Sequence, residues 1–68
     1  MKVSARNVLK GRIIEVTKGA TTAHIKMDVG GIVVTASITN AAVDDLELAI
    51  GKDAYALIKA SDVMVGID

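Results

Sequence analysis

Residues with the functional groups for acid–base or nucleophilic chemistry are scattered along this chain of 68 residues. The only histidine, His24, lies on the polar side of an alternating segment, where a solvated surface histidine is expected. Asp44 and Asp45 stand near the start of a predicted helix, where the helix dipole accounts for their charge. No spacing groups a serine with a histidine and an aspartate, and Gly30-Gly31 lacks a phosphate-loop context. We therefore expect no catalytic residue and no enzyme activity.

Two short polar clusters point to anion binding instead. Ser4 and Arg6 lie on one face of the first predicted strand, and Lys59-Ala60-Ser61 follows near the C-terminus. A guanidinium, an ammonium group, hydroxyls and free backbone N–H groups all donate hydrogen bonds, so this set matches a dianion that carries no proton. The alternative is that Arg6 and Lys59 are ordinary surface charges, and the residues by themselves leave both interpretations open.

The composition limits the partners that the chain can have. Eight Lys and Arg balance eight Asp and Glu, so the formal net charge is +0 and no positive field attracts duplex nucleic acid or an anionic membrane. Cysteine is absent and histidine occurs once, which argues against a bare metal-ion site. No apolar run approaches the ~18 residues that span a bilayer, and no signal peptide is apparent. These features predict a cytoplasmic protein.

The size of the chain predicts self-association. A domain of 68 residues buries too little apolar surface to fold with a wide margin of stability as a lone monomer. Small domains compensate with disulfides, a metal or a partner chain. Because the first two are not expected here, association with further copies of the same chain remains.

The hydrophobic pattern predicts an all-β fold with one short helix. Alternating or mainly apolar residues predict strands over 3–17, 21–29, 32–38, 53–60 and 63–67. Helical spacing of apolar residues predicts a helix over 39–50. Five strands with a helix between the third and the fourth is the order of the oligonucleotide/oligosaccharide-binding barrel. We expect a five-stranded OB-fold barrel that assembles as a homo-oligomer.

Local signals refine these elements. Gly11 is the predicted position of a bulge where the first strand changes its buried face, and Gly30-Gly31 is a predicted two-residue turn. Thr39 or Asn40 is the expected N-cap of the helix, and Gly51 the left-handed residue after its end. The predicted inward-facing residues are Ala23, Ile25, Met27 and Val29 in the second strand and Ile32, Val34, Ala36 and Ile38 in the third.

Three short motifs resemble the Mop family of small molybdate-binding proteins, the molbindins. They are Ser4-Ala5-Arg6-Asn7, Ile38-Thr39 and Lys59-Ala60, and the resemblance covers essentially the whole chain as a single Mop domain, residues 1–68. It implies an OB-fold chain that forms a hexamer, a trimer of dimers. It further implies that molybdate, and tungstate, bind as oxyanions between subunits for storage, buffering or homeostasis of molybdenum, with no organic cofactor.

The resemblance also implies the ligand set. The implied molybdate-binding residues are Ser4, Arg6, Thr39, Lys59, Ala60 and Ser61, with Thr39 supplied by the neighbouring subunit. Relatives often carry proline where this chain has Ser61, which adds a hydroxyl and a free N–H. Relatives also extend polar contacts beyond the threonine, where this chain has Ala42.

Two functions of other classes remain as alternatives. An OB-fold can bind single-stranded nucleic acid, but it does so with aromatic side chains over a positive groove, and Tyr55 is the only aromatic residue here. The same fold can serve as a protein-interaction module. Binding of a molybdenum–pterin cofactor would require a large apolar pocket with aromatic lining, which we do not expect from this composition.

Overall fold

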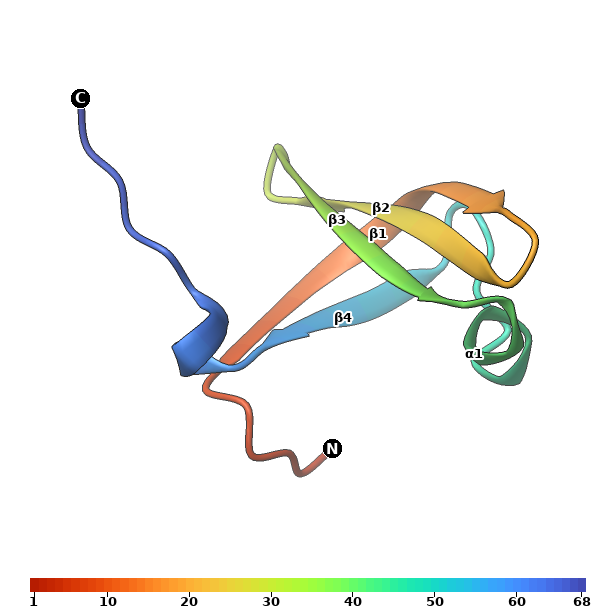
Figure 1. The fold of residues 1–68 in the computed structure, drawn as a ribbon, viewed down its shortest axis with the longest axis horizontal. Helices are drawn as coiled ribbons and strands as arrows, with labels where there is room; N and C mark the ends of the chain where they lie inside the picture. Colours follow the sequence, from red (N-terminus) through yellow and green to blue (C-terminus); the bar gives the residue numbers. More distant parts are fainter.

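The computed structural model describes all residues 1–68 as one antiparallel sheet with a short helix at one end (Figure 1). In chain order the elements are β1 (Asn7–Lys18), β2 (Thr22–Val29), β3 (Ile32–Thr39), α1 (Asn40–Asp45), β4 (Asp53–Ile58) and the 3-10 turn η1 (Ala60–Asp62). The strand order is β3-β2-β1-β4. The predicted all-β class with one short helix is confirmed. No helix has the length and apolarity needed to cross a membrane.

Strand β1 is shared between two partners. Its first half, from Asn7 to Arg12, pairs with β4, and its second half, from Arg12 to Lys18, pairs with β2. Arg12 is the one residue of β1 that is paired on both sides, with Asp28 and with Asp53. The sheet is therefore continuous through a long central strand whose two halves have different neighbours.

The core is small and lies between the sheet and the helix. Only five of the 68 residues are buried, namely Ile13, Ala23, Ile25, Met27 and Val43. The predicted inward face of β2 is confirmed, and in β3 the residues Val34, Ala36 and Ile38 are half-buried as predicted. Ile32 was predicted to face inward, but it lies beside the hairpin turn and is 70% exposed.

The first strand changes its buried face at a bulge, but not at Gly11. The pairing register between β1 and β2 shifts between Ile13 and Glu15, so Ile14 is the extra residue of the bulge. Ile13 is fully buried before it, and Val16 is half-buried after it. The change of parity was predicted correctly, whereas its assignment to the glycine was wrong.

Gly11 instead allows a close approach between strands. A Cβ atom at this position would lie 2.6 Å from the backbone oxygen of Asp28 and 2.8 Å from a methyl carbon of Val29. Any larger residue would therefore push the end of β2 away from β1. The glycine is required by packing rather than by a bulge.

The turn between β2 and β3 is the predicted two-residue turn. Gly30 and Gly31 have φ angles of 59° and 90°, which are strained for any residue with a side chain. The Asp28 carboxylate accepts a hydrogen bond of 2.9 Å from the N–H of Gly31. The glycine pair thus sets the register in which Val29 faces Ile32.

The helix is shorter than predicted. Thr39 is its N-cap, as expected, and its hydroxyl accepts a hydrogen bond of 3.0 Å from the N–H of Ala42. The helix ends at Asp45, so Asp44 and Asp45 lie in its last turn, and the predicted dipole role is wrong. Asp44 pairs instead with Lys18 at 2.6 Å.

The segment after the helix is an irregular connection to β4. Ile50, which we predicted to lie on the helix, is 71% exposed. Gly51 has the expected positive φ of 88°, but in this connection rather than directly after a helix. Its N–H donates to the Ile13 carbonyl at 2.8 Å, and the Ile13 N–H donates to the Lys52 carbonyl at 2.9 Å. These bonds guide the chain into β4.

The predicted fifth strand is not formed. The segment Val63–Ile67 is an extended tail that runs clear of the sheet (Figure 1). Its residues Met64, Val65 and Ile67 are 94%, 91% and 97% exposed. A strand requires an edge to pair with, and within one chain this tail has none beside it. A single chain therefore has four strands rather than the five predicted.

Candidate functional site

Five of the six predicted site residues lie on the two segments that leave the sheet at one end, where β1 begins and β4 ends (Figure 1). Asn7 pairs with Ile58 there, and the Asn7 side-chain amide also donates to the Ile58 carbonyl at 3.1 Å. The segment before Asn7 and the segment after Ile58 therefore leave the sheet at the same end, and they then diverge (Figure 1). The predicted residues on them are Ser4 and Arg6 on the first and Lys59, Ala60 and Ser61 on the second.

The backbone around these residues differs in detail from the prediction. The first strand was predicted to start at residue 3, but it starts at Asn7, so Ser4 and Arg6 lie on a bent segment ahead of it. Strand β4 ends at Ile58, and Lys59 is the N-cap residue of η1. The predicted site residues thus lie on the segments before β1 and after β4, and not on the faces of these strands.

Both cations at this end are free of intramolecular partners. The three salt bridges of the chain join Arg12 to Asp53, Lys18 to Asp44 and Lys26 to Glu15. Arg6 and Lys59 take part in none of them, and both are exposed. A ligand with two negative charges would therefore meet two positive charges that no carboxylate of this chain already neutralises.

The 3-10 turn adds further donors. Its own hydrogen bonds run from the Asp62 N–H to the Lys59 carbonyl at 2.9 Å and from the Val63 N–H to the Ala60 carbonyl at 3.3 Å. The N–H groups of Ala60 and Ser61 come first in the turn and have no partner within it. Together with the exposed hydroxyl of Ser61 they make a set of donors beside Lys59.

Thr39 lies at the opposite end of the sheet. It pairs with Thr22, next to the pairing of Ala23 with Lys18 at the end of β1. Its hydroxyl oxygen already accepts the capping bond, and its proton remains available for donation. The sheet of one chain therefore holds Thr39 apart from the other five residues.

The polar residues elsewhere include one shallow hollow and no cluster of metal-ligating side chains. His24 is exposed, as predicted, in a shallow polar hollow of about 230 Å³ with Thr17, Lys18, Gly19 and Thr22. The lysine of this hollow is held by Asp44. No group of three or more His, Cys, Asp or Glu residues is arranged to hold a metal ion.

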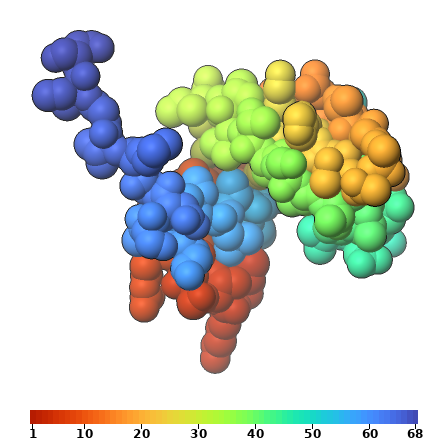
Figure 2. Space-filling view, viewed as in Figure 1, coloured from red at the N-terminus to blue at the C-terminus, as the bar shows by residue number.

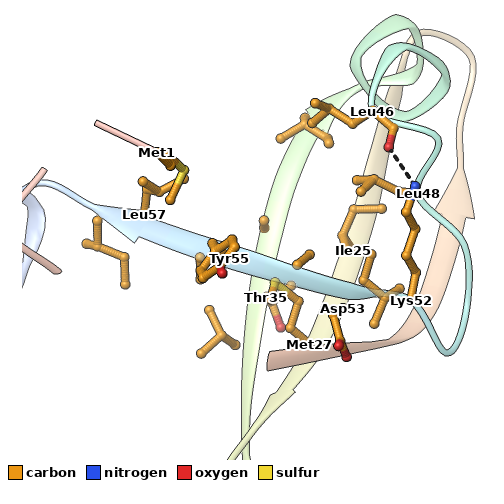
Figure 3. A pocket seen from close by; sticks show the side chains of 17 residues that line it. Met1, Ile25, Met27, Thr35, Leu46, Leu48, Lys52, Asp53, Tyr55 and Leu57 are labelled. Atoms are coloured by element: carbon orange, nitrogen blue, oxygen red, sulfur yellow. Dashed lines mark hydrogen bonds between the residues drawn. The ribbon is translucent and has the colours of Figure 1, made fainter. Parts of the chain in front are cut away.

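A large apolar groove lies between β3 and β4, and the prediction that no such pocket exists is wrong. The groove has a volume of about 720 Å³, and 14 of the 17 residues that line it are hydrophobic (Figure 3). Its one lysine, Lys52, donates to the carbonyls of Leu46 and Glu47 at 3.2 and 2.9 Å. The groove therefore offers little to an oxyanion. The signal in the sequence is the small Ala54 and Ala56 at alternate positions of β4, which leave space above the sheet.

The chain belongs to the TOBE domain family, whose model matches residues 3–65. It is 46% identical over 69 residues to a Haemophilus influenzae protein named "Probable molybdenum-pterin-binding protein", and the match covers 100% of both chains. The predicted resemblance to molybdenum-related proteins is thus confirmed at the level of the family.

Solved structures agree with the fold. The structure of a molybdate-binding protein from Sporomusa ovata superposes with a TM-score of 0.94 at 40% identity, covering 98% of this chain and 100% of that one. ModG, described as a cytoplasmic molybdate-binding protein and solved with molybdate bound, gives a TM-score of 0.95 at 38% identity. The match covers 100% of this chain and 49% of the ModG chain. Both comparisons support the predicted OB-type fold class.

Proposed function

We propose that residues 1–68 act as one domain that binds molybdate, and also tungstate, as the oxyanion, without catalysing a reaction. The observation that carries the proposal is the pair of unneutralised cations, Arg6 and Lys59, on neighbouring segments with free donors beside them. The relatives named for molybdate support the same ligand class. The proposed role is storage, buffering or homeostasis of molybdenum in the cytoplasm, where ModG is described to act.

The chemistry of the donor set favours molybdate over phosphate. Molybdate at pH 7 is a fully deprotonated tetrahedral dianion whose four oxygens only accept hydrogen bonds. Phosphate retains a proton on much of its population at this pH, and a site made only of donors leaves that proton unpaired at a cost of about 1–3 kcal/mol. Sulfate has the same charge and acceptors as molybdate, so selection against it depends on the size of the cage.

The complete site requires a second copy of the chain. Ser4, Arg6 and the segment 59–61 come from one subunit, and Thr39 comes from its neighbour, because the sheet holds them at opposite ends. The proposed assembly is a hexamer built as a trimer of dimers. It is supported by the small intramolecular core of five residues and by the many large apolar side chains left exposed.

Isothermal titration calorimetry tests this proposal. Molybdate and tungstate are titrated into the wild-type protein beside sulfate and a single-stranded oligonucleotide. We expect heat from the first two, affinity at least tenfold weaker for sulfate, and none for the oligonucleotide. Arg6→Ala should weaken molybdate binding at least tenfold, since it leaves one charge of the dianion unbalanced.

Arg12→Ala is the matched control, because Arg12 is an exposed arginine paired with Asp53 away from the cluster. It should bind molybdate like the wild type. Binding of the oligonucleotide in place of molybdate would favour the alternative of a nucleic-acid-binding OB-fold. Equal loss in both arginine variants would contradict the assignment of the site.

A further inference from the structure

The two free cations occupy the first unpaired position beyond the ladder of β1 and β4. Asn7 and Ile58 form the last pair of this ladder. Arg6 directly precedes the first and Lys59 directly follows the second, so they stand where the next pair would form. Figure 2 shows that the N-terminal segment, in red, adjoins the end of β4 and η1, in blue, at this end of the molecule. The cationic residues are thus opposite each other at the point where their segments begin to diverge (Figure 1).

This arrangement places like charges together when no ligand is bound. Residues that face each other across antiparallel strands have Cα atoms about 4.5–5.5 Å apart, and like charges at such positions destabilise the pairing. No carboxylate relieves the repulsion, because the three salt bridges of the chain include neither Arg6 nor Lys59. Both residues are exposed, so solvent and salt weaken the repulsion without removing it. The repulsion therefore favours separation of the two segments unless another interaction holds them.

The side chain of Asn7 supplies such an interaction. Its amide is partly buried and donates a hydrogen bond of 3.1 Å to the Ile58 carbonyl. This carbonyl belongs to the peptide group that leads into Lys59. The backbone nitrogen of Asn7 belongs to the peptide group that follows Arg6. One hydrogen bond thus joins the residues next to the two cations.

The neutral amide links the segments without neutralising the positive charge. A carboxylate in place of Asn7 would have no proton to donate to a carbonyl, and it would compete with a dianion for the cations. At the far end of the same ladder the strands are joined by charged groups instead, Arg12 and Asp53 at 3.9 Å. These two contacts are the only polar side-chain contacts between β1 and β4. The uncharged one lies beside the proposed site.

We infer that Asn7 is a positioning residue of the oxyanion site, whose amide holds Lys59 opposite Arg6 before the ligand binds. The inference rests on the proposed function for its ligand, and on the contact with Ile58 for its geometry. A site whose charges are already in place loses less conformational entropy on binding, which raises the affinity. Asn7 acts through the placement of the two cations, and not by contact with the oxyanion.

Disulfide formation tests the positioning without any oxyanion, because the chain has no native cysteine. The variant Arg6→Cys/Lys59→Cys is oxidised with and without Asn7→Ala, and mass spectrometry after alkylation measures the monomer that has formed an internal disulfide. We expect Asn7→Ala to slow this reaction about fivefold or more. The matched control is Val8→Cys/Leu57→Cys, a pair within the same ladder, whose rate should change less than about twofold.

Molybdate calorimetry tests the consequence for binding. Asn7→Ala should weaken the affinity about fivefold through the loss of one positioning hydrogen bond. Asn7→Asp keeps the shape of the side chain but adds a negative charge beside the cations, so it should weaken the affinity about tenfold or more. Arg12→Ala is the matched control, because it removes the contact at the other end of the ladder. It should bind molybdate like the wild type, and circular dichroism checks that all the variants are folded.

A double-mutant cycle separates positioning from a general loosening of the chain. In the Lys59→Ala background there is no ammonium group to place, so Asn7→Ala should change the molybdate affinity by about twofold or less. A merely structural role would weaken binding by the same factor in both backgrounds. The cycle therefore measures whether Asn7 acts through Lys59.

The outcomes separate this inference from the proposed function. A wild-type protein that binds no molybdate contradicts the proposed function. If the wild type binds molybdate, an equal affinity in Asn7→Ala, or the same factor in both backgrounds of the cycle, overturns the inference and leaves the function standing. An unchanged rate for the Arg6→Cys/Lys59→Cys disulfide also overturns it. So does an equal slowing of the control disulfide, because Asn7 would then stabilise the whole ladder.

Discussion

The meander of β1, β2 and β3 differs from the region that follows α1 in how far its apolar side chains are buried. Four of the five buried residues lie in β1 and β2, and the fifth, Val43, lies in α1. No residue after Val43 is buried, although Leu46, Ile50 and Leu57 are large and apolar. The meander thus holds most of the core, whereas the later region leaves large apolar side chains exposed in the single chain.

The largest expected effect separates the two regions by stability. Ile13→Ala removes a fully buried side chain from the meander and should lower the free energy of unfolding by about 2–5 kcal/mol. Ile50→Ala, in the later region, should change it by less than about 0.5 kcal/mol at low protein concentration. Urea denaturation of both variants measures the difference, and equal losses would remove the contrast.

The next effect concerns the place where the two regions meet. Saturating molybdate should raise the melting temperature of the wild type, since ligand at ~100 times its dissociation constant adds about 2.7 kcal/mol. Arg6→Ala should lose most of this increase, because Arg6 lies where β1 and β4 join. Thermal denaturation with and without molybdate measures it. A full increase in Arg6→Ala, matching that in Arg12→Ala, would place the ligand elsewhere.

The same substitution, glycine to alanine, compares how closely the two regions are packed. Gly11→Ala places a Cβ 2.6 Å from the Asp28 carbonyl oxygen and should cost about 1–3 kcal/mol through overpacking. Gly66→Ala in the tail meets no atom within 4 Å and should leave the stability of the single chain unchanged. Chemical denaturation at low concentration compares them, and a harmless Gly11→Ala would show that β1 and β2 are less closely packed than described.

The smallest expected effect is that of Thr39, which caps α1 in its own chain and is a proposed molybdate ligand in the assembly. Thr39→Ala removes the helix cap and should cost about 1 kcal/mol without ligand. It should also reduce molybdate affinity, because the proposed site would lose the hydroxyl that a neighbouring copy supplies. Thr39→Ser keeps a hydroxyl and should preserve both properties. If Thr39→Ala destabilises the helix but binds molybdate normally, the residue is structural only.

The sequence was informative where a local pattern decides the structure. The alternation of β2, the glycine pair at the hairpin and the Thr39 cap each depend on residues close together in the chain, and each was predicted correctly. The bulge was placed at Gly11 rather than Ile14 because its position depends on the register with β2, which no local pattern contains.

The errors in the later region have a common cause. Val43, Leu46 and Ile50 have helical spacing, but only Val43 packs against the core, so the spacing predicted too long a helix. The tail was likewise predicted as a strand because it is apolar, although it runs clear of both sheet edges of its own chain (Figure 1). In the sequence, an apolar side chain that stays exposed in the single chain looks the same as one that packs in the core.

The candidate site was only partly predictable for a similar reason. The donor types of Arg6 and Lys59 are evident in the sequence, but their proximity follows from the pairing of Asn7 with Ile58. The separation of Thr39 follows from the same antiparallel order. Neither the proximity of Arg6 and Lys59 nor the separation of Thr39 can be read from the sequence, because both depend on how the strands pair.

The division of β1 between two neighbours bears on how the molecule opens. Since Arg12 is the one residue paired with both β2 and β4, the bonds to β4 can break while those to β2 and β3 persist. Amide protons of residues 7–11 and of β4 should then exchange with deuterium through a partial unfolding, ahead of those in the β2–β3 hairpin. The closing of β4 onto β1 joins positions far apart in the chain, whereas the hairpin is local, so the hairpin should form early in folding and β4 should join last.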